Sequence, residues 1–356
     1  MSKTALEHER LVSNGHLSDS LAVASGQLNL AYELNQGEIQ FWKRQVHRSL
    51  AKLKKYRQNQ EGRDIRISFS GFWESFDPNR NEILNLLKET CSEHSSNIAV
   101  SSTAPDIMIS SCFGGIHKEH SKCTQLLYLG ENVRPQYRSF DFSISHDVDS
   151  YCGRNIYLPL WMVRSTRYGI SGAGYDPYDE ESLFGRLVDW ESRTGAVYLG
   201  NNMTPSRAAL FRYLESLGIN VDCYGSQTRP IESKRKLYQK YLFSICFENS
   251  ITPGYNTEKL VDGYIYGTIP IYMGGDSGDL FNKRAYMNID ASRPVYPQLE
   301  IMLRQVDEYK KNVPLVRREE YERVLASAKS SLWLRILKPH TLMTETLKDL
   351  ASPESG

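Results

Sequence analysis

Residues 241–275 read YLFSICFENSITPGYNTEKLVDGYIYGTIPIYMGG. We interpret YLFSICFEN as a strand, NTEKLVDGYIYG (256–267) as a helix and TIPIYMGG as a second strand, joined by a polar loop around Pro253-Gly254. A strand that leads through a helix into another strand is the repeating unit of a parallel sheet.

The same alternation continues on both sides of this segment. Thr204-Pro205 is a typical helix start, with a capping hydroxyl and proline at the first helical position, and Gly218 is a typical residue after a helix end. The neighbouring predictions are the strand AVYLGN (196–201), a helix over 205–217, the strand INVDCYG, a basic helix near 232–240, the strand YMNID and a helix over 297–312.

The first half repeats the pattern from residue 64. The run DIRISFSGF predicts a strand, and Asp77-Pro78 opens the helix NRNEILNLLKETC. The runs NIAVSS, PDIMISS, QLLYLG, FDFSIS and NIYLPLW are apolar at both odd and even positions, as strands covered on both faces are.

The whole pattern predicts an α/β fold with two Rossmann-like domains facing each other across a cleft. The predicted parts are a helical extension over 1–60, an N-terminal domain over 61–165, a linker or insertion over 166–195, a C-terminal domain over 196–330 and a helix or tail over 331–356.

Composition excludes several classes of protein. The 356 residues carry a net charge of +1, which gives no basic excess for nucleic acid, and 40% hydrophobic residues argue against disorder. No apolar stretch is long enough to span a membrane, and the N-terminus lacks the pattern of a secretory signal. Six scattered cysteines without a C-x-x-C pair indicate a reducing compartment, so we expect a cytoplasmic protein.

Residues 41–57 form a basic segment within the extension. Trp42, Val46, Leu50 and Leu53 recur at helical spacing among lysines and arginines, with no acidic residue. A helix packed by one apolar stripe on the main body is the favoured interpretation, and peripheral contact with a membrane surface is the alternative.

Two strand-to-helix turns in the second half concentrate polar residues. Ligands of open α/β sheets bind beyond the carboxyl ends of the strands, where helix N-termini attract anions. Arg207 lies in the first turn after GNNMTPS, where a cation is unfavourable unless an anion shares the site. The alternative is an arginine that reaches a neighbouring acid or solvent.

The second turn follows the strand ending in FEN. Asn256 or Thr257 is placed to cap the next helix, and Glu258 and Lys259 fall in its first turn. A carboxylate there can accept both hydroxyls of a ribose, and an ammonium beside free N–H groups can hold a pyrophosphate. Simple capping explains the acid but not the lysine. The chain has no P-loop and no G-x-G-x-x-G sequence.

Two features of the first half involve carboxylates. Asp147 and Asp149 form an Asp-x-Asp pair that could hold Mn²⁺ or Mg²⁺, although acids often simply end a strand such as FDFSIS, and we favour no metal site. Glu131 directly follows the apolar strand and glycine of QLLYLG. A carboxylate at a strand's carboxyl end can deprotonate an attacking hydroxyl, while the alternative is a solvated loop residue.

These segments together resemble the α1,3/4-fucosyltransferase family, and most closely its soluble bacterial members. FSICFENSITPGYNTEKLVDGYIYGTIPIYMGG (243–275) resembles the family's donor-binding signature of F-E-N, T-E-K and I-P-I. LYLGEN (127–132), SFDFSISHDVD with YLPLWM, and NNMTPSR (201–207) follow in the family's order. The basic segment before residue 60 and the glycine-rich stretch over 165–195 depart from the family pattern.

The resemblance implies an inverting GT-B enzyme that transfers L-fucose from GDP-β-L-fucose to a glycan hydroxyl, with an α1,3-type linkage. It implies Glu131 as the general base, Arg207 and Lys259 at the diphosphate with Tyr255 beside them, and Asn249 and Glu258 at the nucleoside. It implies no required cofactor, with stimulation by Mn²⁺ or Mg²⁺, and an oligosaccharide or lipid-linked glycan as acceptor. The alternatives are a GT-B transferase for another nucleotide sugar and a catalytically silent protein that binds sugar nucleotides or glycans.

Overall fold

The computed structural model describes residues 64–113, 123–135, 137, 140–148, 151, 153–164, 168–170, 180–225, 229–275, 278 and 280–337. The predicted helical extension, its basic segment 41–57 and Asp149 lie outside these residues. The chain divides into two compact units. The first consists of residues up to Asn79, Leu84–Tyr157 and Ala326 onward, and the second of Arg80–Ile83 and Leu158–Leu325.

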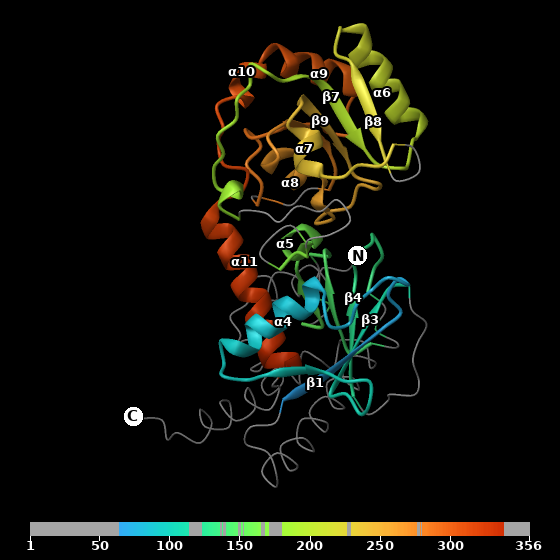
Figure 1. Ribbon diagram of the computed structural model, residues 1–356, viewed down its shortest axis with the longest axis vertical. Coiled ribbons are helices and arrows are strands. Elements are labelled where there is room, and N and C mark those ends of the chain that lie inside the picture. The colour runs from blue at the N-terminus through green and yellow to red at the C-terminus, as the bar shows by residue number, and fades with distance from the viewer. Residues whose placement is uncertain are drawn as a thin grey trace, which may run out of the picture. The chain divides into compact units, whose positions relative to one another are not determined.

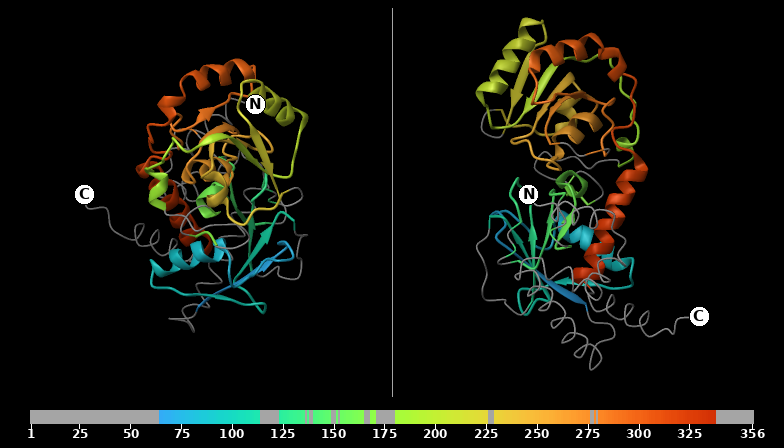
Figure 2. Two further views of the ribbon diagram at one scale, coloured as in Figure 1. Left: turned by 45° about the horizontal axis from the view of Figure 1, so that its top comes forward. Right: turned by 180° about the vertical axis from the view of Figure 1, so that it is seen from behind.

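The first unit contains a six-stranded parallel sheet in the order β2-β1-β3-β4-β5-β6. Its strands are β1 (Ile65–Ser70), β2 (Ile98–Val100), β3 (Ile107–Ser111), β4 (Thr124–Tyr128), β5 (Phe142–Ser145) and β6 (Asn155–Tyr157). Helix α4 (Glu82–Ser92) lies beside the end of α11 (Arg318–Ser331) (Figures 1 and 2), where Lys329 pairs with Glu89 and Glu93. The π-helix η3 (Leu332–Leu337) follows α11.

The second unit contains a five-stranded parallel sheet in the order β11-β10-β9-β7-β8. Its strands are β7 (Thr194–Leu199), β8 (Val221–Tyr224), β9 (Tyr241–Phe247), β10 (Ile269–Met273) and β11 (Met287–Asn288). Its helices are α5 (Leu160–Arg164), the 3₁₀ helix η2 (Glu180–Leu183), α6 (Pro205–Ser216), α7 (Lys234–Tyr238), α8 (Glu258–Ile265), α9 (Val295–Arg304), α10 (Val306–Tyr309) and the first part of α11. The two parallel sheets confirm the predicted α/β fold.

Helices cover both faces of the second sheet (Figure 1). One core joins the strands to α6 and α9 through residues such as Tyr198, Leu214 and Leu299. The opposite face packs Val197 against Leu237 of α7. Alternate residues of β7 therefore point to opposite cores, which explains why the strand is apolar at both parities.

Helix boundaries follow the sequence signals in α6. Thr204 adopts an extended conformation at the N-cap, and its hydroxyl oxygen accepts a hydrogen bond from the Arg207 N–H at 3.3 Å. Pro205 is the first helical residue, and Gly218 after the helix has φ +80°. A glycine is favoured there because other residues are strained at positive φ.

Three local predictions were wrong in detail. The predicted helix over 297–312 is two helices, because Gln305 between α9 and α10 leaves helical geometry at φ −108° and ψ 22°. The end of NIYLPLW belongs to α5 rather than to a strand. Asp77 accepts a hydrogen bond from the Asn79 N–H at 2.8 Å, a local turn that precedes α4 rather than opening it.

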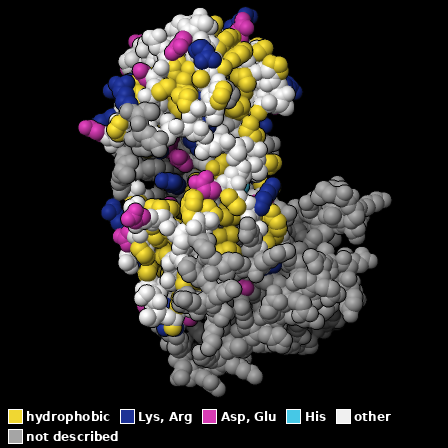
Figure 3. Space-filling view, turned by 90° about the vertical axis from the view of Figure 1, so that its right-hand side faces the viewer, with side chains coloured by type: hydrophobic (Ala, Val, Ile, Leu, Met, Phe, Trp, Pro, Cys, Tyr) yellow, Lys and Arg dark blue, Asp and Glu magenta, His cyan; other side chains and the backbone are white. Residues whose placement is uncertain are grey.

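Hydropathy, surface charge and the state of the thiols can be read from the described residues. Among these residues, no helix combines the length and the hydropathy that crossing a membrane requires. On the face seen in Figure 3, basic side chains lie scattered among acidic and apolar ones instead of forming one basic patch. The cysteines within the described ranges are free thiols: Cys91, Cys112, Cys123, Cys223 and Cys246.

Candidate functional site

A tight turn shapes the loop between β9 and α8. Tyr255 donates its N–H to the Thr252 carbonyl at 3.0 Å, with Pro253 and Gly254 between them. Gly254 has φ +78°. Proline followed by a residue with positive φ is typical of a type II turn, which accounts for the Pro-Gly pair.

Two glycines after β10 let this loop approach the sheet. A Cβ atom at position 275 would lie 1.7 Å from the Thr252 carbonyl oxygen, and one at position 274 would lie 2.8 Å from Cγ of Glu248. A side chain at position 275 would require a backbone shift, whereas one at position 274 would require the Tyr272 and Glu248 side chains to move. The pair Gly274-Gly275 therefore allows the loop to pack closely against the end of β10.

Glu248 is the centre of the hydrogen-bond network at this edge. Its side chain is buried, and its Oε1 accepts from the Thr257 N–H at 2.7 Å. The Thr257 hydroxyl lies 2.8 Å from Oε2, and the Lys259 ammonium donates to Oε2 at 2.9 Å. All these partners can donate, which suits an ionised carboxylate. Glu248 thus fastens the first turn of α8 to the end of β9.

The structure confirms Thr257, one of the two predicted residues, at the N-cap position of α8, but without the capping hydrogen bond. Thr257 occupies the N-cap position but makes no side-chain capping bond, because its hydroxyl is directed to Glu248 and accepts from Lys259 at 2.9 Å. Asn256 is also engaged elsewhere. Its amide donates to the Tyr272 hydroxyl at 2.7 Å and to the Gly275 carbonyl at 2.9 Å.

Lys259 is held as a cation. Burial lowers the pKa of its ammonium, but the carboxylates of Glu248 and Glu258 outweigh burial and raise that pKa above its usual range. Two of its three N–H donors are directed to Glu248 and Thr257. One donor is left for a ligand, and the side chain is 24% exposed.

Glu258 is an ionised carboxylate among cations. Burial acts to raise its pKa, but Lys234, Lys259 and Arg164 lower it to about 2. Lys234 also pairs with the buried Asp262 at 2.5 Å. No side chain in the described part of the molecule donates a hydrogen bond to the Glu258 carboxylate, which accepts one from a backbone N–H.

Arg207 ties α6 to the carboxyl end of β9. The guanidinium is 4% exposed, and its Nη2 donates to the carbonyls of Phe247 at 3.0 Å and Glu248 at 3.1 Å. The same atom donates to the Asn249 side chain at 3.2 Å. Its Nη1 donates to the Asn202 carbonyl. Arg207 therefore bridges the loops that follow β7 and β9, and its contact with an anion stays a prediction from the sequence.

The structure brings five of the predicted site residues to one edge of the second unit. Arg207 contacts Asn249, and Lys259 lies beside Glu258 and near the buried Tyr255. We define these residues with Glu248 as the donor-edge cluster. Glu248 was missed as a site residue, although its position directly after an apolar strand was the signal that singled out Glu131.

Glu131 belongs to the first unit and follows β4. Its side chain is exposed, and its backbone carbonyl accepts from the Val133 N–H at 2.7 Å. Cys112, which follows β3, lies near it: burial, and then the charge of Glu131, raise the pKa of the Cys112 thiol. Glu131 is thus accessible at the carboxyl edge of the first sheet.

The Asp147 carboxylate makes structural contacts within the first unit. Its carboxylate is buried, forms an ion pair with Arg134 and accepts from the Tyr151 hydroxyl at 2.6 Å. Within the described ranges, no group of three or more His, Cys, Asp or Glu residues is arranged to hold a metal ion. The ion pair gives Asp147 a role in joining the loops after β4 and β5.

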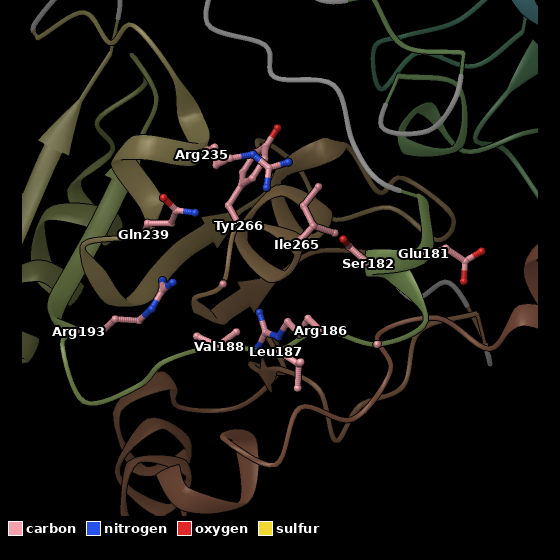
Figure 4. Close-up of a pocket in the computed structure, with 12 residues that line it drawn as sticks. Glu181, Ser182, Arg186, Leu187, Val188, Arg193, Arg235, Gln239, Ile265 and Tyr266 are labelled. Atoms are coloured by element: carbon pink, nitrogen blue, oxygen red, sulfur yellow. The ribbon is translucent and has the colours of Figure 1, made fainter.

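A pocket of about 320 Å³ lies at the opposite end of α8 from Glu258 (Figure 4) and contains none of the predicted site residues. Arg186 lines it and donates to the carbonyls of Thr268, at 2.7 Å, and Tyr264. Its guanidinium stacks 3.8 Å from the Tyr264 ring centroid. Burial lowers the pKa of Arg186 to about 10. Arg186 therefore anchors the segment before β7 to the end of α8.

We expect Arg186→Leu to lower the free energy of unfolding by about 1–3 kcal/mol, because it removes the guanidinium donor from the Thr268 and Tyr264 carbonyls and the stacking on the Tyr264 ring. Arg304→Leu is the control, since Arg304 is 76% exposed and pairs with Glu300 on the surface of α9. Urea unfolding of both variants measures the difference. Equal midpoints for Arg186→Leu and the wild type would contradict the anchoring role.

Comparison with known proteins identifies the family. Residues 67–164 match the model of the alpha-(1,3)-fucosyltransferase FucT N-terminal domain, and residues 192–326 match that of glycosyltransferase family 10 (fucosyltransferase) C-term. The chain belongs to the family 10 fucosyltransferases. The second match contains every residue of the donor-edge cluster, and the first contains Glu131.

Individual proteins that the chain is similar to are also described as fucosyltransferases. The chain is 26% identical to the alpha-(1,3)-fucosyltransferase FucT of Helicobacter pylori over 216 residues, which are 52% of this chain and 45% of that protein. The chain thus matches less than half the length of this curated relative. A crystal structure of an alpha1,3-fucosyltransferase matches with a TM-score of 0.58 at 20% identity, over 77% of this chain and 91% of the other. A crystal structure of an alpha1,3-fucosyltransferase with GDP-fucose matches with a TM-score of 0.57 at 20% identity, over 77% of this chain and 92% of the other. These structures establish the GT-B fold.

Proposed function

We propose that the protein transfers L-fucose from GDP-β-L-fucose to a hydroxyl of a glycan acceptor, with inversion and an α1,3-type linkage. The observation that carries this proposal is the donor-edge cluster, which places an ionised carboxylate, a cation and a helix N-terminus at the carboxyl edge of one sheet. Family membership and the relative that holds GDP-fucose support the choice of donor.

The donor-edge cluster suits the two ends of GDP. The Glu258 carboxylate would accept hydrogen bonds from the ribose hydroxyls, and Asn249, which is exposed, would contact the nucleoside. The ammonium of Lys259 and the first N–H groups of α8 would hold the diphosphate. Arg207 would add positive charge while keeping its own loop in place, with Tyr255 behind Lys259.

The proposed reaction is a single displacement. Glu131 would take the proton of the acceptor hydroxyl as its oxygen attacks the anomeric carbon, and the bond from that carbon to the GDP oxygen would break. Negative charge then develops on the departing phosphate, where Lys259 and Arg207 would stabilise it. The attack from the face opposite GDP converts the β-linked donor into an α-linked product.

We propose that the reaction requires no resident cofactor. The cations that neutralise the diphosphate would be Lys259 and Arg207, a role that a metal ion plays in other nucleotide-sugar enzymes. Added Mn²⁺ or Mg²⁺ would then stimulate turnover without being essential. Activity that disappears on chelation with EDTA and returns only with Mn²⁺ would contradict this.

We expect Glu258→Ala to raise the dissociation constant for GDP roughly 10- to 100-fold, because hydrogen bonds to a charged group contribute about 1.5–3 kcal/mol. Isothermal titration calorimetry with GDP measures the change. Glu300→Ala, an exposed glutamate on α9, is the matched control. If Glu258→Ala binds GDP as the wild type does, Glu258 is not part of the nucleotide site.

The acceptor is proposed to be an oligosaccharide or a lipid-linked glycan. Peripheral membrane contact through residues 41–57 stays a prediction from the sequence. Liposome co-sedimentation of the full chain and of a chain lacking residues 1–60 tests it, and equal binding of both would exclude that segment as the membrane contact.

A further inference from the structure

The pocket at the carboxyl-terminal end of α8 is lined by three arginines and belongs to the second unit. Arg186 and Arg193 come from the segment before β7, and Arg235 comes from α7. In Figure 4, the side chains of Arg186 and Arg193 extend from one side of the pocket, and Arg235 lies on the other side. Among the described residues, the acidic side chain in the lining is Glu181, which forms an ion pair with Arg318. The lining therefore carries an excess of positive charge.

The guanidinium of Arg186 has hydrogen-bond donors that the protein does not use. Its Nη1 donates to the carbonyls of Tyr264 and Thr268. Its Nε and Nη2 are buried and meet no hydrogen-bond acceptor in the part of the chain that the structure describes. Buried polar atoms almost always have a partner, so such an exception indicates a missing acceptor. The Tyr264 ring that stacks on the guanidinium supplies no negative charge.

Contacts with the backbone hold Arg193 in place on the same side of the pocket. Its Nε donates to the Asp189 carbonyl at 3.0 Å, and its Nη1 donates at 3.3 Å to the carbonyl of Tyr238, the last residue of α7. Gly267 leaves room for this side chain, because a Cβ atom there would lie 2.9 Å from Nη2 of Arg193. The guanidinium is therefore positioned before a ligand binds, which lowers the entropic cost of binding.

The charges of Arg186 and Arg193 are only partly balanced by the protein. No carboxylate within the described ranges forms an ion pair with either side chain. Burial lowers the pKa of Arg186 to about 10, and the positive charge of Arg193 acts in the same direction. The carbonyls at the ends of α7 and α8 attract these cations, but a helix end carries only about half a negative charge. Two such ends supply less negative charge than two guanidinium groups require.

We propose that this pocket binds the phosphate group of a small dissolved molecule, at a site separate from the donor-edge cluster. Guanidinium groups present their N–H donors in a planar fork that matches the oxygens of a phosphate. Arg193 and Arg235 would contact the phosphate from the two sides, and a small rotation of Arg186 would direct its Nε and Nη2 to the same group. The volume of about 320 Å³ lies at the lower end of the range for small-molecule pockets.

The position of the pocket on α8 separates it from the donor edge. Glu258 and Lys259 begin this helix, whereas Ile265, Tyr266 and Gly267 at its other end line the pocket. The 8 residues of α8 span about 12 Å, so one diphosphate cannot contact both ends. Both sites can therefore be occupied at the same time, and the proposed function does not depend on this inference.

Calorimetric titration of inorganic pyrophosphate into the full chain saturated with GDP, without divalent cations, tests the proposal. We expect the wild type to bind one pyrophosphate, and Arg235→Gln and Arg193→Gln each to weaken that binding about 10-fold or more, because each removes charged hydrogen-bond donors. Arg304→Gln, which replaces an exposed arginine on α9, is the matched control and should bind as the wild type does. Thermal unfolding checks that each variant is folded.

Three results would overturn the proposal. The first is a GDP-saturated wild type that binds no pyrophosphate, or binds it no more tightly than folded Arg235→Gln and Arg193→Gln. The second is binding that is lost in folded Lys259→Met and kept in Arg235→Gln, which would assign the anion to the donor edge. The third is binding to phosphatidylglycerol vesicles that depends on Arg235 in a protein that binds no pyrophosphate, which would assign the phosphate to a lipid.

The pocket and the proposed function can fail separately. Pyrophosphate binding that depends on Arg193 and Arg235, in a protein that transfers no fucose, would support the pocket and contradict the proposed reaction. Fucose transfer by a protein that binds no pyrophosphate beside GDP would support the reaction and contradict the pocket.

Discussion

Glu131→Gln is expected to lower kcat for transfer to a glycan about 10²- to 10⁴-fold, which is the usual contribution of a positioned general base. Glutamine keeps the shape of the side chain and its exposed position after β4 but cannot take a proton. The affinity for GDP should stay unchanged, because the donor-edge cluster contains no residue of the first unit. Steady-state kinetics and calorimetry on the same preparation measure both quantities.

Glu74→Gln is the matched control for this prediction. Glu74 is also exposed and also follows a strand of the first sheet, since it lies four residues after the end of β1. Its replacement should leave kcat close to that of the wild type. Wild-type turnover in Glu131→Gln would contradict the assignment of the base, and a large loss confined to Glu74→Gln would move that role to Glu74.

Lys259→Met is expected to reduce both stability and donor binding. The substitution leaves the buried Glu248 carboxylate without its ion-pair partner, and breaking a buried pair from one side costs about 3–5 kcal/mol. Because Lys259 is 24% exposed, water replaces part of the lost contact, and we expect about 3 kcal/mol. Denaturant unfolding gives the loss of stability, and calorimetry gives the loss of GDP affinity.

A double variant separates the two roles of Lys259. Lys259→Met with Glu248→Gln removes the unpaired buried charge and should recover most of the stability, while GDP binding stays weak because the cation is still absent. Lys259→Arg keeps the charge and should lose little stability. Recovery of GDP affinity in the double variant would show that Lys259 supports the fold without contacting the diphosphate.

Much of the fold is predictable because its signals are local. Runs such as YLFSICF are apolar at both parities because β9 is covered on both faces, and turn residues such as Pro253-Gly254 separate the elements. The start of α6 at Thr204-Pro205 depends on neighbouring residues alone. The break at Gln305 has no comparable signal, since neither glycine nor proline marks it.

The sequence singles out a candidate site residue where its type is unfavourable for its local structure. Lys259 drew attention because a cation is unfavourable in the first turn of a helix without a nearby anion. The Glu248 carboxylate, 11 residues upstream, supplies a negative charge beside Lys259. It also engages the Thr257 hydroxyl, so Thr257 makes no side-chain capping bond at the start of α8. Sequence spacing alone does not predict that contact.

Other roles depend on contacts that are distant along the chain. Arg186 donates to carbonyls 78 and 82 residues away, so nothing around it in the sequence indicates its anchoring role. Asp147 looked like half of a metal-binding pair, and its partner Arg134 comes from the neighbouring loop.

The most direct test of the central claim is product analysis after incubation with GDP-β-L-fucose and a glycan array, followed by NMR of the anomeric proton of the product. The account predicts an α-linked fucose on a glycan, formed by the wild type and nearly absent with Glu131→Gln. A β-linked product, or turnover of another nucleotide sugar with none of GDP-fucose, would contradict it.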